Sequence, residues 1–558
     1  MSRRLTVAAL RLSLGAALAL TGLTGLAATP ADAATWPAPV EVAPATSAFN
    51  YRWNPQVVVT PGGTTVAAWY ASGDDLDDAI AVVERPPGGS WSAVETIATD
   101  ALGLADLAVG DDGTVALVFT TIVSGKLVVN ASVHPPTGGW VPPVVLSDTT
   151  KTSTAAHVAV GAGVVTAVWV EGAGAASKPM ANTRTLGAAG TWGTPVTFSD
   201  AGVSGIDVAA GAAGTVISWL LSSDPADSYA ASTVRTSFHG TSGSWSAPVS
   251  VSETGRRTQV AEPAIGPDGT LAVAWESRLP TTAGYYTSAR TVAAIQPPGG
   301  GWGTQSLLSD PDIEGRSPHV GVGPDGTTTV VWESYDGANY KVATRVRRGG
   351  TWEPQSDLTQ SVDSESDPRL AMSPDGTAVV EFSNLAHGIG VAIRLPGEPW
   401  RPTDFIAPAS LNGYDRALAV GGGTVAVVWT HGDDYVLRAV VADHLLPLPP
   451  LPKPTAETGQ ITGPKKIEKG KKAAYAFTGT PDSVTFECRV DKTRRQQTGA
   501  TGPKGKKPVP WRACHSPTKV KTKKLKLGRH TLYVRAVLAG VPDPTPSAKK
   551  IKVKQPPA

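Results

Sequence analysis

The chain has 558 residues, a formal net charge of only +2, and abundant glycine (60) and proline (47). Its brief apolar runs favour many short strands joined by tight turns and argue against long helices. The near-neutral charge hides an asymmetry, because residues 453–558 carry 25 Lys and Arg against 6 Asp and Glu, which leaves 24 against 41 in the residues before them. We therefore expect a strongly acidic body followed by a strongly basic tail.

Residues 1–33 have the three parts of a secretory signal peptide. Arg3 and Arg4 lie in a basic region, residues 12–26 form an apolar stretch, and Ala31 to Ala33 make a small-x-small cleavage site. An uncleaved membrane anchor is the alternative, but the stretch is short and contains two glycines. No later window approaches about 18 consecutive apolar residues. We expect an exported protein, extracellular or associated with the cell wall.

Residues 34–444 repeat one cycle eight times: a Trp opens a polar strand, a Gly-rich turn follows, and a short apolar run ends in Trp or Phe. The opening residues are Trp36, Trp91, Trp140, Trp192, Trp245, Trp302, Trp352 and Trp400. The closing residues are Trp69, Phe119, Trp169, Trp219, Trp275, Trp332, Phe382 and Trp429. Only two of the sixteen tryptophans, Trp53 and Trp511, stand outside these two series. A fixed period of this kind indicates a repeat architecture.

Each repeat contains four predicted strands. In one of them the strands are residues 319–322, 328–333, 340–347 and 352–358, with the turn Pro324-Asp325-Gly326 between the first two. Pro fixes φ, Asp bonds its own backbone and Gly accepts a positive φ, so this turn joins antiparallel strands.

The eight sheets are expected to stack radially as an eight-bladed β-propeller over residues 34–444. The first unit opens with a lone fourth-type strand, 36–42, and the last unit has only its first three strands. Pairing of the two would close the propeller without a free edge. A linear solenoid would need capping repeats, and none is visible.

Two columns of residues mark the first strand of each unit. The small column is Val58, Ala108, Ala159, Ala209, Ala264, Gly321, Ala371 and Ala419. Such small side chains suit a strand that crowds toward a common axis. The polar column, two residues earlier on the same side of each strand, is Gln56, Asp106, His157, Asp207, Glu262, His319, Arg369 and Ala417. If these strands are innermost, the polar column rings the mouth of the channel, where it either binds a ligand or merely faces water.

The run from Tyr51 to Pro55, followed by the strand to Trp69, resembles the opening blade of sialidase-type propellers with BNR repeats. The resemblance implies that Arg52 holds a substrate carboxylate and that the chain is a glycoside hydrolase. The family's Asp-box is absent, and the chain offers only Tyr285, Tyr286, Glu276 and Glu333 for its Tyr/Glu nucleophile pair, so no catalytic residue is assigned.

No metal or cofactor is expected. The chain has no His-Glu-x-x-His, Gly-x-Ser-x-Gly or phosphate-binding loop. The acidic run from Asp74 to Asp78 lacks the spacing of a calcium loop and suits a solvated loop.

A proline-rich stretch at 445–459 predicts a stiff linker. Alternating runs at 473–477, 484–490, 523–527, 530–537 and 549–553 predict a β-sandwich over 460–556. Two cysteines in an exported chain suggest one disulfide, between Cys488 and Cys514. The segments around them, including Trp511-x-x-Cys514, resemble immunoglobulin-like modules of secreted bacterial proteins.

The tail's lysines suggest an anionic partner, either a cell-wall polymer or a lipid surface. The candidate residues are Lys465, Lys466, Lys504, Lys506, Lys507, Lys521, Lys523 and Lys524. Nucleic acid is disfavoured because no aromatic residues are interleaved with the lysines. The alternatives are that the lysines only maintain solubility, or that the tail rests on the acidic body.

The sequence thus predicts a secreted recognition or adhesion protein. Its propeller would bind a glycan or another envelope ligand, and its basic module would hold it at an anionic wall. The alternatives are an extracellular glycoside hydrolase of sialidase type and a non-catalytic structural surface protein.

Overall fold

The computed structural model describes residues 36–43, 51–73, 78–187, 190–227, 229–241, 243–279, 288–359, 364–431, 435–446, 457–480, 484–491, 510–538, 541–543 and 546–556. The predicted signal peptide lies outside these residues, as does most of the predicted linker. The chain divides into two compact units, residues 1–449 and 450–558. In the ranges just given, both units consist of strands and short 3-10 turns such as η1 (Gly174–Ala176) and η2 (Ala409–Leu411). In the described part of the chain no helix is long and apolar enough to cross a membrane.

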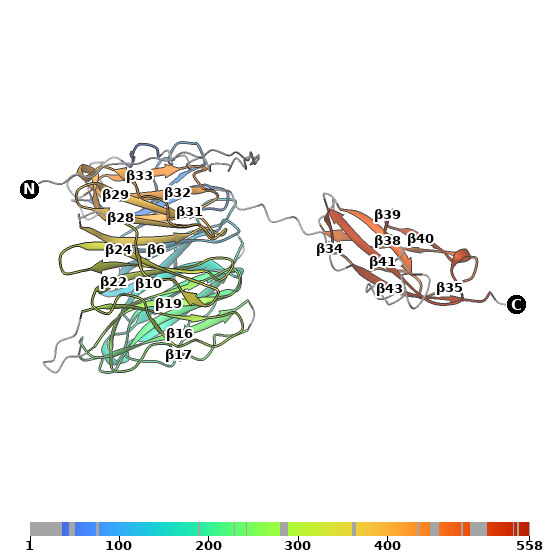
Figure 1. Cartoon of the computed structure of the whole chain (residues 1–558), viewed down its shortest axis with the longest axis horizontal. Coiled ribbons are helices and arrows are strands. Elements are labelled where there is room, and N and C mark those ends of the chain that lie inside the picture. Colours follow the sequence, from blue (N-terminus) through green and yellow to red (C-terminus); the bar gives the residue numbers. More distant parts are fainter. Residues whose placement is uncertain are drawn as a thin grey trace, which may run out of the picture. The chain divides into compact units, whose positions relative to one another are not determined.

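The first unit contains antiparallel sheets of four strand positions (Figure 1). The first strands are β2 (Tyr51–Val59), β6 (Ala101–Val109), β10 (Ser153–Gly161), β14 (Val203–Gly211), β18 (Arg257–Ile265), β22 (Glu314–Val322), β27 (Glu365–Met372) and β31 (Gly413–Gly421). The second strands are β3 (Thr65–Ser72), β7 (Val115–Val123), β11 (Val164–Glu171), β15 (Gly214–Ser222), β19 (Leu271–Arg278), β23 (Thr328–Tyr335), β28 (Ala378–Asn384) and β32 (Thr424–His431). The third strands are β4 (Ala79–Arg85), β8 (Lys126–His134), β12 (Lys178–Thr185), β16 (Ser232–Gly240), β20 (Arg290–Gln296), β24 (Tyr340–Arg348), β29 (Gly388–Arg394) and β33 (Leu437–Ala442).

The fourth strands are mostly short. They are β5 (Glu95–Thr99), β9 (Val144–Val145), β13 (Val196–Thr197), β17 (Val249–Ser250), β21 (Ser306–Leu307), β25 (Thr351–Trp352) with β26 (Ser356–Asp357), and β30 (Asp404–Ala407). The sheet of β31, β32 and β33 receives its fourth strand from the other end of the unit, because β1 (Val40–Ala43) pairs antiparallel with β33. The all-β arrangement of four-stranded antiparallel sheets, typical of a propeller, is confirmed.

The core of the first unit lies between consecutive sheets. The closing Trp and Phe side chains of the second strands are almost completely buried there. One core cluster joins residues of β2 and β3, such as Val57 and Trp69, to residues of β31 and β32, such as Ala417 and Val428. The opening tryptophans are partly buried, and each packs against the margin of one cluster. The two aromatic series therefore have different roles, one inside the core and one at its edge.

The first strands lie against one another in chain order, and β31 lies against β2. Gly321 of the small column lies in one of these contacts, and Gly421, two residues after the column member Ala419, lies in another. A Cβ added to Gly321 would stand 2.2 Å from Cγ of Met372 in the next sheet, and one added to Gly421 would stand 2.3 Å from the carbonyl oxygen of Val59. Small side chains are therefore needed where neighbouring first strands approach most closely.

The Pro-Asp-Gly turns form as predicted. Asp268 accepts hydrogen bonds from the backbone and the hydroxyl of Thr270, at 2.9 and 2.8 Å, and Gly269 has φ +88°. The same pair of bonds recurs at Asp112, Asp325 and Asp375. The side chain thus fixes the turn that joins the first two strands of a sheet.

The second unit has one large sheet in the order β35 (Lys466–Glu468), β43 (Ser547–Lys554), β41 (Gly528–Leu538), β38 (Thr485–Asp491) and β39 (Arg512–Cys514), with β42 (Val541–Pro542) paired to β41. Two smaller sheets pair β36 (Lys472–Tyr475) with β40 (Thr518–Lys521) and β34 (Glu457–Thr458) with β37 (Gly479–Thr480). Tyr475, Leu532, Val534 and Ile551 are buried in its apolar core.

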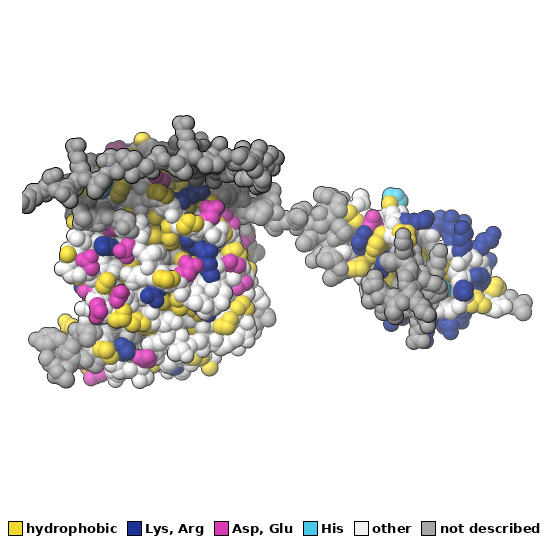
Figure 2. Space-filling model, viewed as in Figure 1, with side chains coloured by type: hydrophobic (Ala, Val, Ile, Leu, Met, Phe, Trp, Pro, Cys, Tyr) yellow, Lys and Arg dark blue, Asp and Glu magenta, His cyan; other side chains and the backbone are white. Residues whose placement is uncertain are grey.

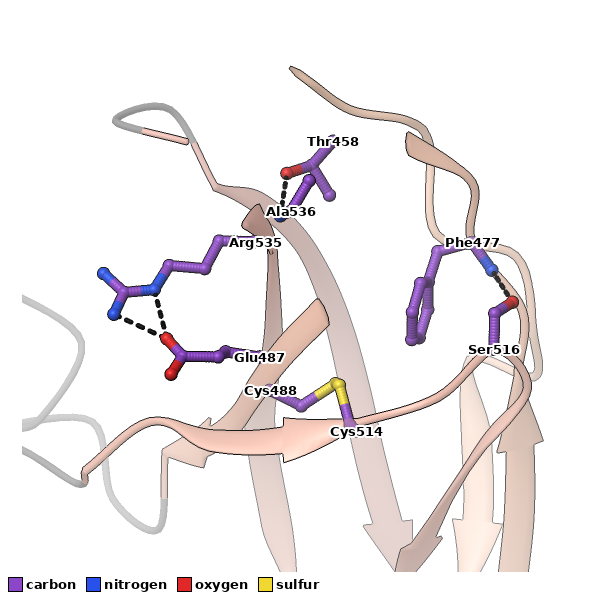
Figure 3. The surroundings of a disulfide bond; sticks show 8 residues. All are labelled: Thr458, Phe477, Glu487, Cys488, Cys514, Ser516, Arg535 and Ala536. Carbon is purple, nitrogen blue, oxygen red and sulfur yellow. Dashed lines mark hydrogen bonds and ion pairs between the residues drawn. A yellow bond between two sulfur atoms is a disulfide. The ribbon is translucent and has the colours of Figure 1, made fainter. Parts of the chain in front are cut away.

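The predicted disulfide is confirmed. Cys488 of β38 and Cys514 of β39 are bonded with their Cα atoms 5.8 Å apart, and both lie beside the core of the second unit (Figure 3). Near them Ser516 accepts a hydrogen bond from the Phe477 amide at 2.9 Å. The bridge therefore fixes the edge strand β39 to the sheet.

The prediction of a strand at 523–527 is wrong. Residues Thr522–Lys524 form the 3-10 turn η4. The Thr522 hydroxyl is buried and lies 2.7 Å from the carbonyl oxygen of Glu468 and 2.8 Å from that of Lys471. Leu525, three residues later, is also buried. The two buried side chains, Thr522 and Leu525, are three residues apart, which is the period of a 3-10 turn. The alternation of lysine with leucine in this segment resembles a strand and led to the wrong prediction.

We predict that Gly421→Ala destabilises the first unit by about 1–3 kcal/mol, because the new methyl group would press on the backbone of Val59 rather than on a flexible side chain. The midpoint of thermal unfolding, followed by tryptophan fluorescence, should fall. Gly301→Ala is the matched control, since a Cβ there meets nothing within 4 Å. Equal midpoints for the two variants would contradict the close approach of β31 to β2.

Replacing both Cys488 and Cys514 by Ala should destabilise the second unit by about 3 kcal/mol, from the chain entropy of the open loop. Urea unfolding monitored by far-UV circular dichroism would detect a shifted transition for this unit. An unchanged transition would mean that the unit's core is sufficient without the bridge.

Candidate functional site

A β-bulge interrupts the first strand of every described sheet in the first unit. The register between first and second strands shifts just before or at the polar column, for example between Trp53 and Gln56 and between Thr154 and His157. Bulge residues with positive φ include Asn54 (+48°), Ser317 (+45°) and Asp367 (+54°). A bulge redirects the side chains beside it, so these bulges set where the polar column points.

Carboxylates of the preceding sheet accept hydrogen bonds from several bulge amides. The amide of Asn54 donates to Asp415 at 3.2 Å, that of Ser317 to Glu276 at 2.8 Å, and that of Asp367 to Glu333 at 3.3 Å. Glu276 and Glu333, considered above as nucleophile candidates, thus bond the backbone of the next sheet. Tyr285 and Tyr286 lie outside the described residues.

The structure brings three members of the polar column together on neighbouring sheets. Nδ1 of His157 lies 3.4 Å from Asp106 and 3.7 Å from Asp207. About a quarter to a third of each of these side chains is exposed (24%, 36% and 32% for Asp106, His157 and Asp207). Asp106 also accepts the backbone N–H of Val158 at 3.0 Å. The imidazole and the two carboxylates therefore satisfy one another while remaining in contact with water.

A similar pair follows three sheets later in the chain. Nδ1 of His319 lies 2.7 Å from Glu262, and Glu262 also accepts the amide of Val320 at 3.2 Å. In both cases the acid of one sheet bonds the side chain and the backbone of the next. These contacts join the first strands of neighbouring sheets.

Arginines complete the set. Arg369 lies 3.2 Å from Asp367, which also pairs with Arg416 at 3.1 Å. Arg416 is buried and forms a 2.5 Å ion pair with the fully buried Glu381. Gln56 donates to Asn54 at 3.3 Å, and Ala417 is buried. Most charges of the polar column thus have partners within the protein.

The neighbours of His157 and Asp207 shift their pKa values. Burial by itself would lower the pKa of His157, but the charges of Asp207 and Asp106 outweigh it and raise that pKa to about 9. Burial raises the pKa of Asp207 to about 7, with Glu262 and Asp106 adding to the rise and His157 opposing it. The pair therefore holds protons more tightly than the same groups would in the unfolded chain.

Arg52 lies beneath the surface. Its side chain is only 3% exposed, and Nη1 donates to the carbonyl oxygen of Tyr435 at 3.3 Å. Burial lowers its pKa. The residue predicted to hold a carboxylate is therefore engaged with the backbone next to an exposed surface rather than forming that surface itself.

The surface beside Arg52 is aromatic. Tyr51, Trp53 and Tyr435, here called the aromatic trio, lie with ring centroids 4.8 Å (Tyr51–Tyr435) and 5.1 Å (Trp53–Tyr435) apart, both edge to face. Trp53 is 42% exposed. Asn54, which follows it, donates from its side chain to the carbonyl oxygen of Leu104 at 2.7 Å and bonds Asp415 through its amide. The bulge and its hydrogen bonds thus hold an indole in water against two tyrosines.

The sequence alone did not predict the aromatic trio as a binding site. The available signal was that Trp53 belongs to neither tryptophan series, and so is not needed by the repeat. Tyr435 carries no such signal, because it lies some 380 residues away in the chain. Only the approach of the last sheet to the first brings it to Trp53.

The candidate lysines of the second unit occupy exposed positions where they are described. These are Lys465, Lys466, Lys521, Lys523 and Lys524. Lys504, Lys506 and Lys507 lie outside the described residues. Within the described ranges no group of three or more His, Cys, Asp or Glu side chains could hold a metal ion.

No family model and no curated protein matches the chain. Solved structures resemble it distantly. The NanB sialidase from Streptococcus pneumoniae is 12% identical, with 72% of this chain and 70% of that chain covered and a TM-score of 0.30. An α-L-arabinofuranosidase from Fusarium graminearum is 13% identical (73% and 98% covered, TM-score 0.37). A protein of unknown function from Dyadobacter fermentans is 11% identical (73% and 98% covered, TM-score 0.36).

We predict that the first unit becomes less stable as pH rises from 5 to 9. The pKa of Asp207 is 3.8 in the unfolded chain and about 7 in the folded protein, so its contribution to stability is lost as pH rises from 3.8 through about 7. The pKa of His157 rises from 6.5 to about 9 on folding, so its contribution is lost between those two values. In Asp207→Asn, the decrease of the thermal unfolding midpoint between pH 5 and pH 9 should be smaller by about 1–3 °C. Parallel pH profiles of the variant and the wild type, measured by tryptophan fluorescence, would contradict the assigned pairing.

Proposed function

We propose that this chain is a secreted glycan-binding protein. Its first unit is an eight-bladed β-propeller over residues 34–444, closed by the N-terminal strand, and its second unit is a basic immunoglobulin-like module over 460–556. The first unit recognises the glycan, and the second retains the protein at an anionic cell wall. Pairing of β1 with β33 and the core cluster shared by the first and last sheets support the closed propeller.

The observation that carries glycan binding is the exposed aromatic trio. Burying an indole normally stabilises a protein, so a Trp left 42% exposed and held edge to face by Tyr435 is available to a ligand. Pyranose rings have a face of C–H bonds that packs on exposed aromatic rings, and their hydroxyls bond nearby polar groups. Asn54 follows Trp53 in the chain and Asp415 accepts its amide, so polar groups of this kind lie near the indole.

The polar column supports a secondary role in binding. Gln56, Asp106, His157, Asp207, Glu262, His319 and Arg369 are partly exposed, and a ligand that extends from the trio toward the inner edge of the sheets would meet them. Their mutual ion pairs favour a structural role first, since a ligand would have to compete with partners already in place.

Hydrolysis of a sialidase-type substrate is the alternative activity. Arg52 and the carboxylates Glu276 and Glu333 are its possible participants, and all three bond backbone groups. Their engagement favours binding without turnover.

We predict that Trp53→Ala lowers affinity for the bound glycan about tenfold or more, the usual effect of removing a central aromatic contact. A glycan array would first identify the ligand, and titration calorimetry would then compare variants. Phe405→Ala is the matched control, because this aromatic residue is 44% exposed but lies on the outermost strand β30. Binding unaffected by Trp53→Ala would overturn the assignment of the trio, and release of free sugar would favour the hydrolase.

A further inference from the structure

Three cationic residues lie directly opposite one another on adjacent strands of the second unit. Lys466 of β35 pairs with Lys552 of β43, and Lys552 pairs with Arg529 of β41. All three side chains are exposed, while their neighbours Ile467, Ile551 and His530 are buried. This cation row, Lys466, Lys552 and Arg529, therefore crosses the outer face of the sheet at right angles to the strands.

The backbone fixes the row in place. The amide of Lys552 donates to the carbonyl oxygen of Lys465 at 2.9 Å, and that of Lys469 donates to Lys554 at 2.8 Å. Neighbouring strands lie about 4.8 Å apart, so the side chains start at about that spacing. The row is thus a property of the register and not of flexible loops.

Such a row is unfavourable for the isolated protein. Like charges directly opposite each other on neighbouring strands destabilise a sheet. Among the described residues of this unit there is one salt bridge, between Glu487 and Arg535. It does not involve a member of the cation row. Scattered lysines would give solubility without this repulsion, so solubility alone does not account for the arrangement.

Further lysines lie next to the cation row along the direction of the strands. Lys550 and Lys554 stand two residues to either side of Lys552 on β43 and are exposed, and the exposed acid Glu468 of β35 lies opposite Lys554. A second like-charge pair, Lys472 opposite Lys521, joins β36 and β40. Figure 2 shows Lys and Arg side chains gathered at the end of this unit where β35 and β40 lie.

The geometry points to the class of partner. We propose that the cation row binds a linear phosphate polymer whose chain runs across β35, β43 and β41, one phosphate group near each cation. This inference rests on the retention role proposed for the second unit and names its site and ligand chemistry. Lysine is a compact point charge that suits phosphate, and regularly spaced cations suit a polymer with regularly spaced charges.

Two other anionic partners fit less well. A protein that binds a lipid surface also inserts apolar side chains into it. In the described part of this unit, Leu527 is the only large apolar residue that is exposed. Single-stranded nucleic acid would need free aromatic faces. Trp511 already lies against the guanidinium groups of Arg489 and Arg535, at 4.7 and 4.4 Å.

The test compares two triple variants of the full chain for binding to linear inorganic polyphosphate. Lys466→Gln/Lys552→Gln/Arg529→Gln removes the cation row, and Arg512→Gln/Lys519→Gln/Lys526→Gln removes the same charge from exposed positions outside the row and outside the candidate lysines. We expect the first to weaken binding at least tenfold and to reduce the slope of log affinity against log salt by about 2. The second should weaken binding less than about threefold.

A stability measurement separates binding from folding. Because the row is repulsive, its removal should raise the unfolding midpoint of the second unit or leave it unchanged, which shows that lost binding does not come from lost structure. Equal losses of affinity in the two triple variants would overturn the cation row while leaving general retention by charge intact. No binding of the wild type to any polyanion would instead overturn the retention role itself.

The ligand class is tested with the same proteins. Polygalacturonate, an oligothymidylate and vesicles containing phosphatidylglycerol serve as the carboxylate, nucleic-acid and lipid probes. Preference for polyphosphate that depends on the cation row supports the inference. Tighter, row-dependent binding to any of the other three would overturn the assignment to a phosphate polymer.

Discussion

The first unit depends on burial of sheet faces by other sheets. A four-stranded sheet with tryptophan on its second strand has two apolar faces, and its own strands cover neither of them. Each core cluster of this unit accordingly combines residues of two consecutive sheets, and one cluster combines the last sheet with the first. Stability is therefore collective, since loss of one contact between sheets exposes two faces at once.

The same packing explains the contacts that the first strands make. Gly321 and Gly421 allow first strands to approach until backbone and side chains touch, so polar side chains beside them meet their counterparts on the next sheet. His157 and His319 bond acids on neighbouring sheets for this reason. Trp53, the ligand contact that we propose, stays exposed because the bulge that follows it holds its indole in solvent.

Much of this architecture is legible in the sequence because it repeats. The tryptophan series, the Pro-Asp-Gly turns and the pairing of Cys488 with Cys514 follow from local patterns. The aromatic trio and the cation row do not, because each depends on register between distant strands: Tyr435 reaches Trp53, and Lys466 reaches Lys552, only in the folded chain. The buried hydroxyl of Thr522 likewise shows why alternating lysines at 523–527 do not form a strand.

The pairing of β1 with β33 has a consequence for biogenesis. Strands nearly 400 residues apart in the chain must meet before that sheet is complete. Until then β33 presents an unsatisfied row of amide and carbonyl groups, open to the β1 strand of another molecule as well as to its own. Emergence of the chain from its N-terminus leaves the earliest strand waiting longest for its partner, so crowding of nascent copies would favour exchanged dimers.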